Sequence, residues 1–423
     1  MLRRVKTAAR LLKDYGFKYT YSYAISWTIE RFGRSWRNSK HLTEVYDVEL
    51  ELPEIPLPSI NYDVQNIIDL GDSKVATSKA LVNAKTPYVW FVPAWTNVWG
   101  GGHFTIFRFA NYFSKTRHNI VFVYDNAGRF TAKSFKKTFD EAFPKNTLEV
   151  IVEAEKLPKN MIPIATTWQS VFSLLKNSTN ISKRFYFMQD YESMFYAHGT
   201  QSMQALASYE QGLIGITGGP WLLSKFREHG GDGMNYMFTV DHDIFFPLSV
   251  SRKKVKRIFF YGRPSTERRC FELGIASLKL VKEKYPEIEI VIAGLDGIGN
   301  VGFEVTLLGS VPLPKLGELY RSCDLGLALS GTNLSYLPVE LMACGVPVVT
   351  NSGPQVNWYC ENGVNSLVVQ PFPTSILTAI EKIITSSELR KVLISGGLKS
   401  SLQTDWANEA SRIQNFIEFN VSA

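Results

Sequence analysis

Arginines lie next to a buried strand in the second half of the chain. The strand RIFFY ends at Gly262-Arg263-Pro264, and Arg268 follows five residues after Arg263. Two guanidinium groups at the carboxyl end of a strand are able to hold a diphosphate through paired hydrogen bonds and to stabilise charge on a leaving group. Arg269 is placed to exchange roles with Arg268. The alternative is that these are solvated surface arginines.

A carboxylate occupies the first turn of a later helix, Glu340. Residues 323–350 read as a buried strand (324–329), a polar turn (330–336), a helix opening at Leu337 or Pro338, and a second buried strand (347–350). In such a βαβ unit the turn leaves the carboxyl end of a parallel strand, where open α/β sheets bind ligands. A carboxylate repels an anion there, so a pair of sugar hydroxyls is its natural partner. A dipole-stabilising role in the helix is the alternative.

The first half carries weaker candidates. Gly100, Gly101, Gly102 and His103 lie between the strand YVWFVPA and the helix FTIFRFANYFSK. Glycine allows close approach of the backbone, so these amides are able to meet a phosphate or a sugar, although a tight turn explains them equally. His103 is a donor to the diphosphate or sugar, or a capping residue. Asp190 ends the strand RFYFMQ and contacts the sugar or the acceptor, or caps the next helix.

Strands and helices alternate in both halves, which predicts two doubly wound parallel sheets. We expect a basic and aromatic helical extension over 1–50, a first Rossmann-like domain over 51–238, a linker over 239–257 and a second such domain over 258–400. The C-terminal helix, 401–423, is expected to pack back on the first domain.

The composition is that of a globular protein: 423 residues, 45% hydrophobic and 20% charged, with a net charge of +7. Four widely spaced cysteines without a C-x-x-C pair indicate reduced core residues. With no run near the ~18 apolar residues of a membrane span, and no apolar core behind the basic amino terminus, we expect a cytoplasmic protein. Residues 1–40 suggest either peripheral contact with the inner face of the cell membrane or a homodimer, and nucleic acid is not expected as a partner.

Several motifs occur together in the second half. They are FFYGRPSTERRCFELGI, IVIAG, LLGSVPLPKLGELYRSCDLGLALS, LPVELMACGVPVVTNSG and ENGVNSLVV. In this order they resemble the nucleotide-sugar domain of GT-B glycosyltransferases, most closely retaining glycosyltransferase family 4, over about 239–395. The chain also resembles, in FMQDYE and FFYGRPSTERRCFELG, the rhamnosyltransferases of bacterial S-layer and surface-glycan assembly.

The resemblance implies specific roles. Arg263 and Arg268 match an arginine and a lysine that hold the donor diphosphate, and Glu340 matches the second of two glutamates eight residues apart, which binds the ribose. Thr332 stands where the first glutamate is expected, so the contact with the sugar is altered. We predict catalytic roles for Arg263, Arg268, Asp190 and His103. The predicted donor-binding residues are Gly101, Gly102, Gly262, Arg263, Arg268, Thr332, Asn333, Ser335, Tyr336, Leu337 and Glu340.

The expected reaction is transfer of a hexose, L-rhamnose from dTDP-β-L-rhamnose, to a growing glycan, either free or lipid-linked, with retention of configuration. Asp241-His242-Asp243 has the Asp-x-Asp form of metal-dependent sugar transferases, but VDHDIFFP matches the linker of the resembled family. We therefore expect no essential metal and no cofactor besides the donor substrate. A nucleotide-sugar epimerase and a non-catalytic nucleotide-sugar-binding scaffold in a glycan-assembly complex remain the alternatives.

Overall fold

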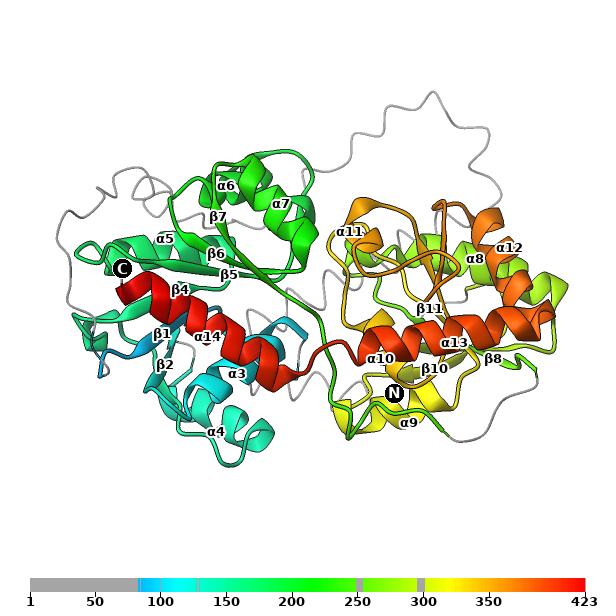
Figure 1. The fold of residues 1–423 in the computed structure, drawn as a ribbon, viewed down its shortest axis with the longest axis horizontal. Helices are drawn as coiled ribbons and strands as arrows, with labels where there is room; N and C mark the ends of the chain where they lie inside the picture. Colours follow the sequence, from blue (N-terminus) through cyan, green and yellow to red (C-terminus); the bar gives the residue numbers. More distant parts are fainter. Residues whose placement is uncertain are drawn as a thin grey trace, which may run out of the picture. The chain divides into compact units, whose positions relative to one another are not determined.

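A computed structural model describes residues 83, 85–99, 101–126, 128, 130–248, 254–294 and 301–422. The predicted helical extension over 1–50, with its proposed membrane or dimer contact, lies outside the described residues, as does Gly100. Two parallel sheets make up the described chain (Figure 1). The predicted fold class, two Rossmann-like domains, is confirmed.

The first sheet has seven parallel strands in the order β3-β2-β1-β4-β5-β6-β7. Its strands are β1 (Tyr88–Val92), β2 (Asn119–Val123), β3 (Glu149–Ile151), β4 (Ile162–Ala165), β5 (Phe185–Met188), β6 (Ile214–Gly218) and β7 (Asp232–Tyr236). The intervening helices are α3 (Gly101–Phe113), α4 (Ala132–Ala142), α5 (Trp168–Asn177), α6 (Thr200–Tyr209) and α7 (Pro220–Glu228), with short 3-10 turns η1 (Ala154–Lys156) and η2 (Glu192–Phe195). Apolar runs such as YVWFV are buried along their whole length because helices cover both faces of the sheet.

The second sheet has six parallel strands in the order β10-β9-β8-β11-β12-β13. They are β8 (Arg257–Tyr261), β9 (Glu289–Ala293), β10 (Thr306–Gly309), β11 (Leu325–Leu327), β12 (Val348–Asn351) and β13 (Leu367–Val369). Its helical segments are η3 (Glu267–Arg269), α8 (Phe271–Lys284), α9 (Leu313–Arg321), α10 (Leu337–Ala343), α11 (Pro354–Asn357), α12 (Pro373–Thr385) and α13 (Ser387–Ser401). Helix α10 begins at Leu337 with Pro338 in its first turn, where a missing N–H leaves no bond unmade.

The winding direction reverses once in each sheet. Strand β1 lies between β2 and β4, and β8 lies between β9 and β11. Ligands of open α/β sheets bind outside the carboxyl ends of the strands near such a reversal. The loops that follow β1, β4, β8 and β11 lie at these reversals, and the loop after β5 lies next to the first of them.

Helix α14 (Trp406–Ser422) follows the second sheet in the chain but packs beside α3 of the first (Figure 1). The Arg108 guanidinium of α3 lies 4.4 Å from the Trp406 ring centre. At the other end of the helix, Arg117 pairs with Glu418 at 2.7 Å. One ion pair and one cation–π contact thus hold the last helix against the first domain.

The segment after β7 is held closely against α9. An added Cβ at Gly317 of α9 would lie 2.0 Å from the Ile244 carbonyl oxygen, and Arg321 donates to the same oxygen over 2.8 Å. Only glycine permits this approach of a helix to a backbone segment.

Replacing Gly317 by alanine should lower the midpoint of thermal unfolding, because the new methyl group forces the two segments apart at a cost of about 1 to 3 kcal/mol. Gly101→Ala is the matched control, since an added Cβ there meets no atom within 4 Å. The control should be neutral or stabilising by up to about 1 kcal/mol. Equal midpoints for the two variants would contradict the close approach.

Candidate functional site

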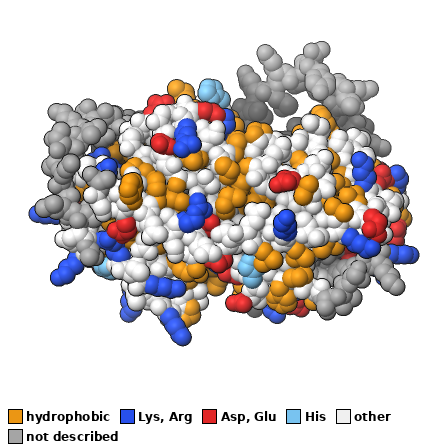
Figure 2. All heavy atoms as spheres, in the orientation of Figure 1, with side chains coloured by type: hydrophobic (Ala, Val, Ile, Leu, Met, Phe, Trp, Pro, Cys, Tyr) orange, Lys and Arg blue, Asp and Glu red, His pale blue; other side chains and the backbone are white. Residues whose placement is uncertain are grey.

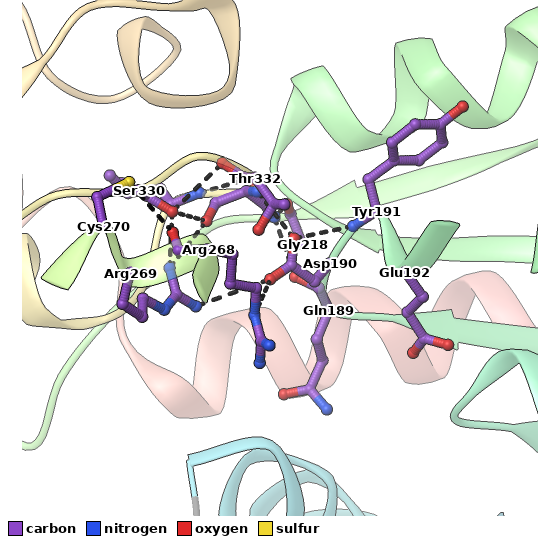
Figure 3. Close-up of polar contacts among 12 residues, drawn as sticks. Gln189, Asp190, Tyr191, Glu192, Gly218, Arg268, Arg269, Cys270, Ser330 and Thr332 are labelled. Atoms are coloured by element: carbon purple, nitrogen blue, oxygen red, sulfur yellow. Dashed lines mark hydrogen bonds and ion pairs between the residues drawn. The ribbon is translucent and has the colours of Figure 1, made fainter. Parts of the chain in front are cut away.

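Loops from both sheets meet around Asp190, which follows β5 (Figure 3). Its Oδ2 lies 3.5 Å from Nε of Arg268 and 3.7 Å from a terminal nitrogen of Arg269. Its Oδ1 accepts hydrogen bonds from the Asn333 amide at 2.8 Å and from the Tyr191 amide at 2.9 Å. The structure therefore brings together three residues that the sequence predicted separately, Asp190, Arg268 and Asn333.

Arg269 is held within the second domain. One terminal nitrogen donates to Ser330 Oγ over 2.7 Å and to the Asn333 carbonyl over 3.2 Å. Burial is the main cause that lowers the pKa of this guanidinium, and Asp190 opposes that effect. Sequence reasoning treated Arg269 only as a substitute for Arg268, whereas the structure gives it a distinct position that braces the loop after β11.

Arg263 and Gly262 lie directly after β8. Arg263 is exposed, and its carbonyl accepts a bond from the Thr266 amide at 2.9 Å. Gly262 is buried, and an added Cβ would lie 2.5 Å from a methyl carbon of Ile292. The glycine thus lets the loop turn closely over β9, which leaves the Arg263 side chain at the surface and separate from Asp190.

Thr332 is buried, at 2% exposure, and its hydroxyl oxygen has no hydrogen-bond partner among the described residues. Ser335, Tyr336 and Leu337 are only partly buried. The Tyr336 ring stacks on Phe238, with 4.4 Å between ring centres. The loop before α10 therefore carries two buried hydroxyls, those of Thr332 and Tyr336, without a hydrogen-bond partner among the described residues, and a stacked aromatic ring.

Glu340 lies in the first turn of α10 and accepts a hydrogen bond from the Tyr320 hydroxyl of α9 at 3.1 Å. Burial raises the pKa of Glu340 to about 7. The Tyr320 bond and the Arg108 charge act in the opposite direction, while Asp241 adds to the rise. The carboxyl is thus a hydrogen-bonding group whose charge changes near neutral pH.

His103 and the glycines begin α3. Nε2 of His103 lies 3.1 Å from the Pro93 carbonyl, and since a carbonyl only accepts, Nε2 carries the proton. Burial lowers the pKa of His103, which favours the neutral ring. Gly101 and Gly102 are exposed, and the Gly102 carbonyl accepts a bond from the Gln189 side chain at 3.0 Å. This bond connects the glycine segment to the loop that carries Asp190.

Glu192 holds the loop that carries Asp190 against the start of α5. Glu192 was not predicted from the sequence. Its Oε2 accepts a bond from the Trp168 amide at 2.6 Å, at the start of α5. Burial raises the pKa of Glu192 to about 8. Figure 3 shows Glu192 on the far side of Asp190 from the arginines. A sequence signal existed in the run Asp190-Tyr191-Glu192, but its two carboxylates could not be assigned opposite directions.

The Asp241 carboxylate forms a bidentate ion pair with Arg108. Within the described ranges no group of three or more His, Cys, Asp or Glu side chains is arranged to hold a metal ion. Likewise, none of the helices in those ranges is long and apolar enough to cross a membrane. Charged side chains of both signs are interspersed on the face drawn in Figure 2.

Residues 256–381 match the family described as "WsaF, C-terminal domain". Over 338 residues the chain is 36% identical to the O-antigen biosynthesis protein RfbC of Myxococcus xanthus, a match that includes 77% of this chain and 26% of that protein. The chain thus spans about a quarter of the length of this relative.

Solved structures with low sequence identity share the fold. Sucrose-phosphate synthase of Thermosynechococcus elongatus superposes with a TM-score of 0.61 at 13% identity, covering 80% of this chain and 100% of that one. HepE of Anabaena, crystallised with UDP-glucose, superposes with a TM-score of 0.63 at 15% identity, covering 79% of this chain and 99% of that one. WaaG, a glycosyltransferase involved in lipopolysaccharide biosynthesis, superposes with a TM-score of 0.55 at 12% identity, covering 78% of this chain and 99% of that one. The two parallel-sheet domains of this chain therefore form a GT-B fold.

Proposed function

We propose that the chain is a glycosyltransferase of bacterial surface-glycan assembly. The observation that carries this proposal is the position of Arg268 and Arg269. They follow β8, where the winding of the second sheet reverses, and lie beside Asp190 of the first sheet. Two guanidinium groups against one carboxylate leave positive charge for a diphosphate. The name of the Myxococcus xanthus relative and the UDP-glucose bound to HepE support a nucleotide-sugar donor and a surface-glycan product.

The finer assignment rests on the family resemblance: L-rhamnose from dTDP-β-L-rhamnose, retention of configuration and a glycan acceptor that is lipid-linked. The bond between the sugar anomeric carbon and the diphosphate breaks with its electron pair on the diphosphate. A bond then forms from the acceptor oxygen on the same face, and the acceptor proton passes to the diphosphate. Arg263 and Arg268 stabilise the growing negative charge, and Glu340 binds the ribose. No metal enters this scheme.

The epimerase alternative needs acid and base groups that converge on one sugar carbon. Asp190 instead contacts two arginines and two backbone amides. The Nε2 proton of His103 is directed at Pro93. These contacts favour glycosyl transfer over epimerisation of the sugar.

Incubation with dTDP-β-L-rhamnose and a panel of glycan acceptors should release dTDP and extend an acceptor by one deoxyhexose. Mass spectrometry detects the product, and NMR of its anomeric proton reports whether configuration is retained. A reaction with donor alone is the control. An epimerised donor would establish the epimerase instead, and binding of nucleotide-sugars without transfer to any acceptor would establish the scaffold.

Arg268→Ala should lower turnover by two orders of magnitude or more, because removing a group that stabilises transition-state charge costs about 2.7 to 4 kcal/mol. Arg263→Ala should show a comparable loss, because its exposed side chain is proposed to reach the diphosphate of the bound donor. Arg227→Ala is the control, since Arg227 is exposed and pairs with Asp232 of the edge strand β7. Full activity of both test variants would refute the diphosphate role of these arginines.

Glu340→Gln should change how stability depends on pH. The folded protein keeps the Glu340 proton up to about pH 7, while an unfolded chain loses it near the ordinary glutamate pKa of 4.5. The favourable contribution of the protonated group is therefore complete below the unfolded pKa and is lost as the pH rises toward the folded pKa. Between these two pKa values the free energy of unfolding of the variant should therefore rise relative to that of wild type, by roughly 3 kcal/mol.

Thermal unfolding of both proteins between about pH 4 and pH 8 measures this difference. Glu388→Gln, at an exposed position of α13, is the control. Calorimetry at the upper end of this range should also show weaker binding of dTDP to Glu340→Gln. Parallel stability curves would contradict the titration of Glu340, and unchanged dTDP affinity would refute its ribose role.

A further inference from the structure

The two adjacent arginines differ in which domain accepts their side-chain hydrogen bonds and ring contacts. Arg269 bonds to Ser330 and to the Asn333 carbonyl, both of the second domain to which it belongs. Arg268 has its side-chain contacts with the first domain. Its guanidinium carbon lies 3.9 Å from the centre of the Phe195 ring, and its Nε lies 3.5 Å from Asp190. Arg269 also lies 3.7 Å from Asp190, but its two hydrogen bonds are made within the second domain, whereas the side-chain contacts of Arg268 among the described residues are all with the first. The position of Arg268 therefore depends on the first domain more than that of Arg269 does.

The contact with Phe195 restricts the orientation of Arg268. A guanidinium over an aromatic face is attracted by the ring and keeps its N–H groups free at the edge of its plane. Asp190 Oδ2 lies 3.5 Å from Nε, an ion-pair contact without a hydrogen bond. Its terminal nitrogens make no hydrogen bond to the described residues and are therefore able to bind another anion.

Asn333 determines where Asp190 lies. Its backbone N–H donates a hydrogen bond to Asp190 Oδ1 over 2.8 Å. Its side-chain nitrogen donates to the carbonyls of Gln189 at 3.0 Å and Gly218 at 2.6 Å, both in the first domain. Its side-chain oxygen accepts from the Trp358 indole at 3.2 Å and from the Leu334 amide at 3.0 Å.

These bonds use both donors and both lone pairs of the Asn333 amide, and the residue is 0% exposed. A buried amide with every bond made fixes one arrangement, because any shift leaves a buried polar group unpaired. Asn333 therefore joins the donor-side loop after β11 to the ends of β5 and β6 in a single geometry. Predicted from the sequence as a donor-binding residue, it has no side-chain atom left for a ligand in this arrangement.

We propose that Asn333 is a positioning residue that acts through Arg268. By fixing the Gln189–Asp190 segment against the second domain, it presents Asp190 and Phe195 to Arg268, so that this arginine is ordered for a nucleoside diphosphate only when the two domains are in contact. Arg269 keeps its hydrogen bonds to Ser330 and Asn333 in either case. The inference rests on the proposed function, since it assumes that a nucleoside diphosphate binds beside Arg268.

Calorimetry with dTDP and with thymidine tests the proposal, because their affinity ratio isolates the contribution of the diphosphate. Arg268→Ala should reduce this ratio about tenfold or more, as expected for loss of a charge-assisted hydrogen bond. Asn333→Leu, which removes the amide bonds without adding charge, should reduce the ratio to a similar extent. In the double variant the second substitution should have no further effect.

Asn365→Leu is the matched control. Asn365 is also a buried asparagine, but its bonds to Tyr359, Ser400 and Glu361 lie within the second domain. It should leave the ratio unchanged while lowering stability. If Asn333→Leu does not fold, Phe195→Leu takes its place in the same cycle, since Phe195 is only partly buried and its loss should reduce the ratio about threefold or more through Arg268 alone.

The outcomes distinguish failure of the proposed function from failure of the proposed role of Asn333. Equal affinities of wild type for dTDP and thymidine would overturn both the proposed function and this inference. A wild-type preference for dTDP that is lost in Arg268→Ala, together with additive effects in the cycle, would keep the function and overturn the role of Asn333. Non-additive effects, with the control unchanged, are the expected result.

Discussion

The site depends on one carboxylate that serves two domains. Asp190 directs one oxygen to backbone amides and the other to two guanidinium groups. The carboxylate is 7% exposed, and a buried charge of this kind is stable only when it is paired and hydrogen-bonded. With all four contacts made, neither domain can move at this point without exposing or unpairing a charge. The geometry of the arginine pair follows from that constraint.

Glycines make the contact between the loops close enough for these bonds. Gly218 offers its carbonyl to Asn333, and an added Cβ at Gly219 would lie 2.5 Å from the Trp358 ring. Gly219 also has φ of +86°, which disfavours other residues. The indole that lies over this glycine also donates to Asn333. The run Gly218-Gly219 therefore gives the polar contacts room by removing side chains from the interface.

Much of the fold is readable from the sequence because buried parallel strands are continuous apolar runs, as in YVWFV and RIFFY. Strand β7, with the sequence DGMNY, was not predicted. It is an edge strand with only Tyr236 fully buried, so it has no apolar run to recognise. The arginines and Asp190 were recognisable as charged residues after strands. Their pairing was not, because it depends on the relative placement of two sheets that no local pattern encodes.

The roles of Asn333 and Thr332 show where sequence reasoning reaches its limit. The two neighbours are both buried, yet Asn333 makes every possible side-chain bond, while the Thr332 hydroxyl makes none to the residues that the structure describes. Position 332 is where the resemblance leads one to expect a glutamate. A second carboxylate there would stand one residue from the amide that binds Asp190, and would reduce the positive charge that two arginines and one aspartate leave for a diphosphate. A neutral hydroxyl at Thr332 avoids that repulsion. The departure from the family pattern is therefore consistent with the charge that Asp190 brings from the other domain.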